Sequence, residues 1–302
     1  MPVSIDDIAM QCGVDADTVQ RVLDSARARG SRSLGILYAD ESGRGLTHSF
    51  FSPILNAVKE EAAGHGYDVT FIRPQADYLE RCLGVDGVCM VCVDFAAPQI
   101  RALVTSGIPC VTVDHIFKGA PAVLSDNETG VRKLVEYALS QGHRRIAFIH
   151  GHNNSVVTRA RIQQFQNTMA YYKLPVPEGY LREGRYDNVP LTRQLVAELL
   201  KLDERPTCIL LPDDITYLGA MEAARDFGLD IPGDISFAGY DGIALIQKLD
   251  PPLTTIRQDA ERMGHTAARL LIDQIENPAT AKRKPFIFPV EFMPGGTMTP
   301  PH

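Results

Sequence analysis

The sequence predicts an α/β protein in which a short pair of helices precedes two parallel sheets, each covered by helices on both faces. The first observation is that apolar runs alternate with amphipathic stretches from Ser33 onward. Because these runs are apolar throughout, they are typical of strands buried on both faces. The second observation is that the scheme begins again near residue 146, which indicates two doubly wound lobes. A length of 302 residues agrees with about two domains.

The first 23 residues have the pattern of two short helices joined by a turn that contains Gly13. Ile5, Ile8 and Ala9 share one face of the first helix, and the stretch after the turn has a facing apolar stripe. That stripe consists of Val14, Thr18, Val19, Val22 and Leu23. Asp15 stands where a helix N-cap belongs. The pattern is typical of a helix-turn-helix, and on pattern alone a two-helix cap without a nucleic-acid role is the alternative.

In the first half of the chain, continuous apolar runs predict the strands and amphipathic stretches predict the helices between them. The expected strands are 34–38, 68–72, 87–93 and 110–113. The expected helices are 50–65, 98–106 and 127–141. Gly66 closes the first of these helices, and Gly142 closes the last in a left-handed conformation. His143 then lies at a structural corner before a strand, so we do not expect it to contact a ligand.

The second lobe repeats the alternation. Its expected strands are 146–149, 208–211 and 235–238, and its expected helices are 158–172, 191–201 and 215–227. In parallel sheets of this kind ligands bind beyond the carboxyl ends of the strands. A cleft between two such lobes is therefore the natural binding site.

Composition excludes several classes of protein. Hydrophobic residues make up 45% of the chain, but no run of eighteen apolar residues occurs, so no transmembrane helix is expected. The first residues include Asp6 and Asp7 and no basic segment, which argues against a signal peptide. A formal net charge of −7 leaves room only for a local nucleic-acid surface. We expect a cytoplasmic protein with no membrane partner.

The cysteines predict no disulfide framework. Cys89 and Cys92 lie in one apolar run, and residues three apart on a strand point to opposite faces. They therefore cannot chelate one metal or bridge each other if the strand runs through both. Buried, reduced thiols are the better interpretation, and they suit a cytoplasm.

Enzyme signatures are missing from the sequence. Gly43 and Gly45 are not followed by the rest of a dinucleotide loop, and no Walker loop, nucleophile elbow or zinc-binding H-E-x-x-H occurs. Asp213 and Asp214 follow an expected strand, where adjacent carboxylates suit a metal or a polyhydroxylated ligand. No third metal ligand is readable nearby. We therefore expect no catalytic residue, no metal and no cofactor.

Motifs in a fixed order run through nearly the whole chain. The first 23 residues carry I-x-D-I-A, C-G-V and T-V-x-R-V-L. Later motifs are D-N-E-T-G at 126–130, G-H-R-R-I at 142–146, R-I-Q-Q-F at 161–165, I-P-G-D-I-S at 231–236, G-Y-D at 239–241 and P-L-T-T-I-R-Q at 252–258. Their order and spacing resemble the lactose-repressor (LacI/GalR) family of bacterial transcription regulators.

The resemblance implies a two-lobed type-1 periplasmic-binding-protein fold whose lobes are joined by three crossings. A truncated helix-turn-helix is expected at 1–25, a linker at 26–33 and an effector-binding domain at 34–302. Within that domain, lobe 1 takes about 34–125 and 259–285, and lobe 2 takes about 126–258 and 286–302. The second lobe includes a C-terminal strand near 286–293.

The resemblance also implies which residues bind the effector at the cleft. Arg161 matches an arginine that grips ligand hydroxyls or a carboxylate, and its fixed fork of donors suits that task. Asp241 matches an aspartate that accepts hydrogen bonds from ligand hydroxyls. The remaining expected contacts are Phe50, Phe51, Tyr186, Asp213, Asp214 and Gln258. Core packing is the alternative for the aromatic residues, and an interlobe salt bridge is the alternative for Arg161 and Asp241.

The head of the chain departs from the family pattern. Relatives continue with a third helix and a hinge helix, whereas only residues 24–33 separate Leu23 from the first expected strand. Ten residues make at most about 15 Å of helix, so neither element fits. The expected DNA contacts are Asp17, Thr18, Gln20 and Arg21. Because residues 1–33 carry four arginines and five aspartates, we expect weak and strongly salt-dependent DNA binding.

The sequence therefore predicts an effector-responsive transcription regulator that binds DNA as a homodimer. Its small polar effector is expected to be a sugar or sugar derivative, because carboxylates suit hydroxyl donors and disfavour multiply phosphorylated ligands. One alternative is a ligand sensor with impaired DNA binding. Another is the solute-binding protein of a transporter, which the helix-turn-helix and the missing signal peptide disfavour. An enzyme is the most distant interpretation.

Overall fold

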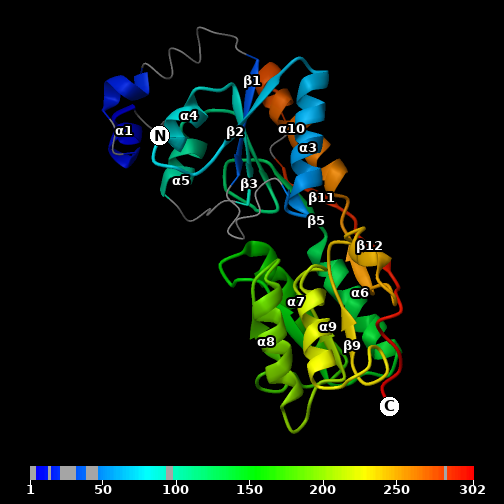
Figure 1. Ribbon diagram of the computed structural model, residues 1–302. Helices are drawn as coiled ribbons and strands as arrows, with labels where there is room; N and C mark the ends of the chain where they lie inside the picture. The colour runs from blue at the N-terminus through cyan, green and yellow to red at the C-terminus, as the bar shows by residue number, and fades with distance from the viewer. Residues whose placement is uncertain (1–4, 13–14, 21–31, 39–46, 93–97, 282–283) are drawn as a thin grey trace. The chain divides into compact units, whose positions relative to one another are not determined.

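The computed structural model of the chain describes residues 5–12, 15–20, 32–92, 98–281 and 284–302, apart from 39–46. The chain forms two compact units. The first comprises Met1–Leu124 and Ala260–Ile287, and the second comprises Ser125–Asp259 and Phe288–His302. The chain thus passes from one unit to the other three times (Figure 1). Each unit contains its own parallel sheet, as the predicted α/β class requires.

A six-stranded sheet with the order β11-β5-β4-β3-β1-β2 forms the centre of the first unit. Its strands are β1 (Ser33–Tyr38), β2 (Asp68–Ile72), β3 (Gly87–Val91), β4 (Cys110–Val113), β5 (Ala122–Ser125) and β11 (Phe286–Phe288). The strands β1 to β5 pair in parallel. Because β1, β3 and β4 are almost wholly buried, they show the continuous apolar pattern of strands covered on both faces.

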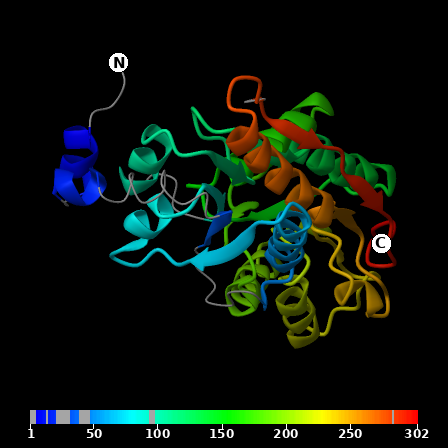
Figure 2. The ribbon, with the colours of Figure 1, turned by 90° about the horizontal axis from the view of Figure 1, so that it is seen from above.

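The helices of this unit are α3 (Phe51–Gly64), α4 (Tyr78–Leu83), α5 (Pro98–Thr105) and α10 (Ala260–Glu276). Helices α3 and α10 lie side by side (Figures 1 and 2), although 195 residues lie between the end of α3 and the start of α10 in the sequence. The approach is close, because a Cβ atom at Gly264 of α10 would lie 2.3 Å from the carbonyl oxygen of Ile54 on α3. Glu61 of α3 also accepts hydrogen bonds from Arg269 Nε at 2.7 Å and His265 Nδ1 at 2.9 Å. These contacts lower the pKa of the Glu61 carboxyl, with the Arg269 hydrogen bond as the largest cause.

The second unit contains a four-stranded parallel sheet with the order β7-β6-β8-β9. Its strands are β6 (Ile146–His150), β7 (Leu181–Glu183), β8 (Cys208–Leu210) and β9 (Ser236–Ala238). A bridge from Ala238 to Thr254 leads on to the antiparallel pair β10 (Thr255–Arg257) and β12 (Glu291–Met293). The helices are α6 (Asn127–Ser140), α7 (Val156–Tyr171), α8 (Val189–Leu200) and α9 (Tyr217–Asp226), with the short 3-10 helix η2 (Ile246–Lys248).

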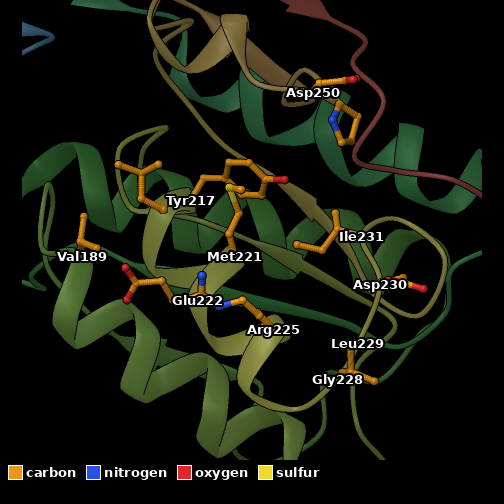
Figure 3. Close-up of a pocket in the computed structure, with 12 residues that line it drawn as sticks. Val189, Tyr217, Met221, Glu222, Arg225, Gly228, Leu229, Asp230, Ile231 and Asp250 are labelled. Carbon is orange, nitrogen blue, oxygen red and sulfur yellow. The ribbon is translucent and has the colours of Figure 1, made fainter.

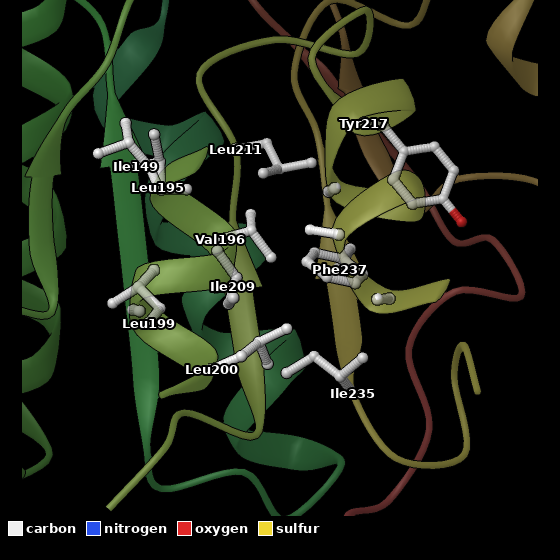
Figure 4. Packing of buried hydrophobic residues seen from close by; sticks show 14 of the residues in the cluster. Ile149, Leu195, Val196, Leu199, Leu200, Ile209, Leu211, Tyr217, Ile235 and Phe237 are labelled. Atoms are coloured by element: carbon white, nitrogen blue, oxygen red, sulfur yellow. The ribbon is translucent and has the colours of Figure 1, made fainter. Parts of the chain in front are cut away.

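One core of the second unit lies between this sheet and helices α8 and α9 (Figure 4). Ile209 and Phe237, on neighbouring strands, belong to the same buried cluster as Val196 and Leu199 of α8. All four side chains are completely buried. Burying a large aliphatic or aromatic side chain stabilises a fold by roughly 1.5–3 kcal/mol. The loops at the carboxyl edge of this sheet therefore follow strands that are held by a well-packed core.

The described part of the head agrees with the predicted helix pair. Helix α1 (Ile5–Cys12) is followed by a helical stretch at residues 16–20. Ala9 and Val19 are buried against each other's helices. The backbone N–H of Thr18 donates to Asp15 Oδ1 at 2.6 Å, which confirms the predicted N-cap. The turn at 13–14 and the linker expected at 26–33, apart from its last two residues, lie outside the described residues.

The segment at 286–293 differs from the single strand that the sequence predicts. It forms two strands, of which β11 joins the sheet of the first unit and β12 pairs with β10 in the second. Pro289 lies between them. Since proline has no backbone N–H to donate, it interrupts a strand. The crossing from one unit to the other occurs at this point, after Ile287.

The strand predicted over 87–93 also ends early, at Val91. Cys92 adopts a left-handed backbone with φ of 52°, so it lies beyond the regular strand that carries Cys89. The prediction that Cys89 and Cys92 lie on opposite faces of one strand is therefore wrong, because Cys92 is not part of the strand. Cys82, Cys89, Cys92, Cys110 and Cys208 are free thiols, as predicted, and burial raises the pKa of Cys89 to about 12. Within the described parts of the chain, none of the helices has the length and apolar character that crossing a bilayer requires.

Candidate functional site

The predicted effector residues of the second unit gather at the carboxyl edge of its sheet. Asp213 follows β8, Asp241 follows β9 and Gln258 follows β10. Arg161 comes from α7, and Tyr186 lies beyond β7. Because parallel strands end at the same edge, side chains far apart in the sequence meet there. The structure thus places these five predicted residues in one region of one unit.

Arg161 is held in a fixed position, with only 3% of its surface exposed. Its Nε donates to Asn127 Oδ1 at 2.7 Å, and its Nη1 donates to the carbonyl oxygen of Pro212 at 3.1 Å. Its Cζ lies 3.6 Å from the centre of the Tyr240 ring, a stacking geometry that suits a guanidinium. The sequence predicted the arginine, but not the tyrosine on which it stacks.

Tyr186 lies on the same side of the site. The centre of its ring is 5.9 Å from Cζ of Arg161. Its hydroxyl and Thr158 Oγ1 share a hydrogen bond of 2.8 Å, which fixes the ring over α7. The aromatic residue expected at the site is therefore next to the expected arginine, with one polar end anchored.

Asp241 has a constrained backbone. Its φ of 110° is unusual for a residue with a side chain, and its N–H donates to Ile256 O at 2.7 Å. Gln258 Nε2 donates to Asp241 Oδ1 at 2.7 Å. Burial raises the pKa of the Asp241 carboxyl well above its usual value, while the charge of Arg161 acts in the opposite direction. A strained backbone at the carboxyl end of a strand is typical of a functional position.

Asp213 and Asp214 have their carboxylate oxygens engaged within the protein. Asp213 accepts from the backbone N–H of Asp187 at 2.7 Å and of Thr216 at 2.9 Å. Asp214 accepts from the N–H of Ile243 at 2.7 Å and from Thr255 Oγ1 at 2.5 Å. Burial raises the pKa of Asp213 to about 6 and that of Asp214 to about 7, and these hydrogen bonds act against the rise. Both residues therefore tie neighbouring loops together.

Asp187 is a member of the site that the sequence reasoning missed. It is buried, its backbone is left-handed with φ of 58°, and its N–H bonds to Asp213. Its charge raises the pKa of Asp213. The signal in the sequence was its place directly after Tyr186, but a lone aspartate in a polar loop carries no pattern.

Phe50 and Phe51 belong to the first unit, at the start of α3. Their ring centres lie 5.2 Å apart in an edge-to-face arrangement, and Phe51 also contacts Tyr38 at 6.0 Å and His48 at 4.7 Å. Phe50 is buried, which agrees with the alternative of core packing. Their contact with an effector stays a prediction.

The corner at Gly142 and His143 is structural, as predicted. Gly142 has φ of 97°, which ends α6 in a left-handed conformation. His143 is buried, and its Nδ1 shares a hydrogen bond of 2.9 Å with Thr207 Oγ1. Burial lowers the pKa of His143 to about 4, so the ring is neutral at pH 7.

The predicted DNA-contacting residues are only partly described. Asp17 is exposed on the second helix of the head, whereas Thr18 and Gln20 are half-buried there. Arg21 lies outside the described residues. The exposed acid on this helix is consistent with a head that attracts phosphate weakly.

A depression of about 700 Å³ lies on the surface of the second unit between α9 and two loops (Figure 3). Tyr217, Met221 and Ile231 contribute apolar surface, and Glu222 and Arg225 contribute charge. None of the predicted effector residues lines it. Across the described residues, no group of three or more His, Cys, Asp and Glu side chains is arranged to hold a metal ion.

Comparison with known proteins agrees with this architecture. Residues 135–298, more than half of the chain, match a family model described as a periplasmic binding protein-like domain. The HTH-type transcriptional repressor PurR of Vibrio parahaemolyticus serotype O3:K6 is 29% identical over 275 residues, which are 87% of this chain and 80% of that protein.

Solved structures give the same result. A regulatory protein of the LacI family from Chloroflexus aggregans is 26% identical with a TM-score of 0.77, covering 89% of this chain and 99% of that one. A LacI family transcriptional regulator from Enterococcus faecium, solved with bound ribose, is 25% identical with a TM-score of 0.77 and the same coverage. The predicted two-lobed fold is confirmed. The chain has a periplasmic-binding-protein-like domain and belongs to the LacI/GalR family of transcriptional regulators.

Proposed function

We propose that this chain is an effector-responsive repressor whose second unit binds a small polar molecule, a sugar or sugar derivative. The observation that carries the proposal is the grouping of Arg161, Asp241 and Gln258 at one sheet edge. Hydroxyl groups both donate and accept hydrogen bonds, so they match an arginine beside a carboxylate and an amide. The bound ribose in the Enterococcus faecium relative supports a sugar of this kind.

The predicted residues take different roles in this proposal. Arg161, Asp241 and Gln258 contact the ligand, and Tyr186 covers an apolar ring face. Asp213 and Asp214 hold the loops in place, because backbone and threonine donors already occupy their oxygens. Phe50 and Phe51 contribute from the first unit.

A thermal-shift screen of sugars, sugar phosphates and purines tests the proposal. We expect a sugar or sugar derivative without a phosphate group to raise the melting temperature, with sugar phosphates giving smaller shifts. Asp241→Asn should reduce the shift, whereas Glu136→Gln, on the exposed face of α6, should retain it in full. Stabilisation by purines alone would contradict the sugar assignment.

The second part of the proposal concerns DNA. The head provides Asp17, Thr18, Gln20 and Arg21, with little net attraction for phosphate because its formal charge is −1. We propose binding that is weak and falls steeply with salt. Fluorescence anisotropy with palindromic DNA, selected with and without the effector, checks this. Tight, sequence-specific binding at physiological salt would show that the head is more complete than we propose.

A ligand sensor with impaired DNA binding is the second candidate, favoured by the same excess of acids in the head. It predicts effector binding without DNA binding at any salt concentration. In either case we propose a homodimer that works in the cytoplasm, where its DNA target and its reduced thiols belong. The repressor relatives support regulation rather than catalysis.

A further inference from the structure

The candidate site brings several carboxyl groups together around Arg161. Four aspartates, Asp187, Asp213, Asp214 and Asp241, form what we call the acidic cluster, and Arg161 is the cation among them. The charges of Asp213 and Asp214 both act on Asp241 and raise its pKa. Crowded, buried carboxylates of this kind are costly to ionise together. A positive charge placed beside them lowers that cost.

Arg161 has already committed several of its donors. Its Nε and Nη1 bond to Asn127 and Pro212, and the face of its guanidinium stacks on Tyr240. It acts on Asp241 by charge, and these contacts hold it in position. A cationic group of a ligand placed beside Asp241 would favour the ionised form of this carboxyl group.

Gln258 provides a second, independent observation. Its side chain is 95% buried, with 5% exposed, and its Nε2 is used to donate to Asp241 Oδ1. Its Oε1 is buried and has no hydrogen-bond partner among the described residues. A buried carbonyl oxygen without a donor costs free energy, so a ligand donor at this point is favoured. The atom beside Asp241 that lacks a partner, Gln258 Oε1, therefore needs a hydrogen-bond donor.

We propose that the effector of this site carries a protonated amine that lies against Asp241 and Gln258, and that it is an amino sugar. An ammonium group has three N–H donors and no acceptor, which suits a carboxylate beside an unpaired amide oxygen. A hydroxyl satisfies the same atoms but brings no charge to the acidic cluster. The inference rests on the proposed sugar effector and specifies its chemistry.

Calorimetric titration of the full chain with matched triplets of sugars tests this. Each triplet contains an amino sugar, its hydroxyl parent and its N-acetyl derivative: glucosamine, galactosamine and mannosamine with their counterparts. The N-acetyl compound keeps an N–H but removes the charge. In at least one triplet the amino sugar should bind about tenfold or more tighter than both counterparts, as expected for a charge-assisted contact.

Two variants locate the preference. Asp241→Asn should reduce the ratio of amino-sugar to parent affinity to about one, and Gln258→Leu should reduce it in part. Glu136→Gln is the matched control, since it removes an exposed carboxylate on α6 that pairs with Arg132. Circular dichroism of each variant checks that it folds, and the unmodified chain tests the preference by itself.

The outcomes separate this inference from the proposed function. If some sugar of the set binds but no amino sugar binds more tightly than both of its counterparts, the amine is overturned and the sugar effector still stands. Retention of the full preference in Asp241→Asn would overturn the placement of the amine. Absence of binding by every member of every triplet would count against the sugar effector as well.

Discussion

Arg161 is the residue on which the candidate site depends most directly. Arg161→Ala removes two hydrogen bonds and the stacking on Tyr240, and it leaves Asp241 without its opposing charge. We expect affinity for the effector to fall about ten- to a hundredfold, the usual size of a lost charge-assisted contact. Calorimetry with the effector measures this. Arg159→Ala is the control, since Arg159 is exposed on the same helix; equal affinities in both variants would remove Arg161 from the site.

Asp213 should make stability depend on pH. Its pKa is raised from 3.8 to about 6, chiefly by burial, so the folded state holds the proton more tightly than the unfolded state. The stabilising contribution is then full below about pH 4 and is lost as pH rises through about 6. Asp213→Asn removes this titration. From pH 4 to 7, the free energy of unfolding of the variant should therefore rise relative to the unmodified chain by on the order of 2–3 kcal/mol.

Urea denaturation of both proteins at several pH values measures that difference. A difference that stays constant between pH 4 and 7 would mean that Asp213 titrates normally in the folded chain. Glu61→Gln serves as a contrast, because the pKa of Glu61 is lowered and its removal should change the pH dependence in the opposite direction.

At the residue scale, sequence motifs indicated side chains that the fold brings together, but they did not reveal contacts set by long-range hydrogen bonds. Arg161, Asp241 and Gln258 were found because each stands in a recognisable motif. The sequence could not show that Asp213 binds the main chain of Asp187, since the two residues are 26 positions apart. Asp187 was missed for the same reason: its place at the site depends on how the loop folds, and the local sequence does not show this.

At the scale of elements, helix α6 sets the position of Tyr240. A Cβ atom at Gly130 of α6 would lie 2.2 Å from the Tyr240 hydroxyl oxygen and 2.9 Å from Cζ. Gly130→Ala should therefore displace the ring on which Arg161 stacks. We expect a loss of stability of roughly 1–3 kcal/mol and weaker effector binding, although the residue itself contacts no ligand in our proposal.

Gly64→Ala is the matched control for this variant. Gly64 is the last residue of α3, and a Cβ atom there would meet no atom within 4 Å. Its replacement should be neutral or slightly stabilising, by up to about 1 kcal/mol. Thermal melts and effector titrations of both variants decide the matter. Equal behaviour of the two would mean that Tyr240 moves aside without consequence.

Elements with long apolar runs or strong helical periodicity were predicted well, and short elements were not. Strand β4 lies at the predicted residues, and α6 begins at Asn127 as predicted. In contrast, β7 has three partly exposed residues and α4 has six residues, too few for periodicity to show. Strand β5 is buried but has only four residues. Its strand state depends on pairing with β4, which the local sequence does not encode.

At the scale of the whole molecule, we expect a homodimer. The second unit exposes Leu245 by 74%, together with Leu218 and Phe227. Leu218 lines the depression beside α9. Leu245 directly precedes η2, and Asp250, which follows η2, also lines the depression. Exposed apolar side chains are candidates for an interaction surface, and a twofold axis would bury the same surface on both copies.

Light scattering at micromolar concentration should give about twice the chain mass of 33.2 kDa. Leu245→Asp should shift the protein toward the monomer. Tyr171→Asp, which changes a residue exposed by 80% at the end of α7, should leave the dimer intact. A chain that stays monomeric at every concentration would count against symmetric DNA binding as well as against this surface.

The packing of α10 on α3 has a consequence for the order in which the chain is made. Helix α3 is complete at Gly64, but the helix that covers it begins at Ala260. During translation at about 5–20 residues per second, the partner of α3 follows after roughly 10–40 s. Throughout that interval the side of α3 that meets α10 stays uncovered on the ribosome-bound chain. Folding of the second unit is also delayed, because its last segment begins only at Phe288. Neither half can finish folding before synthesis is nearly over, so this protein is a natural client for chaperones that shield nascent apolar surface.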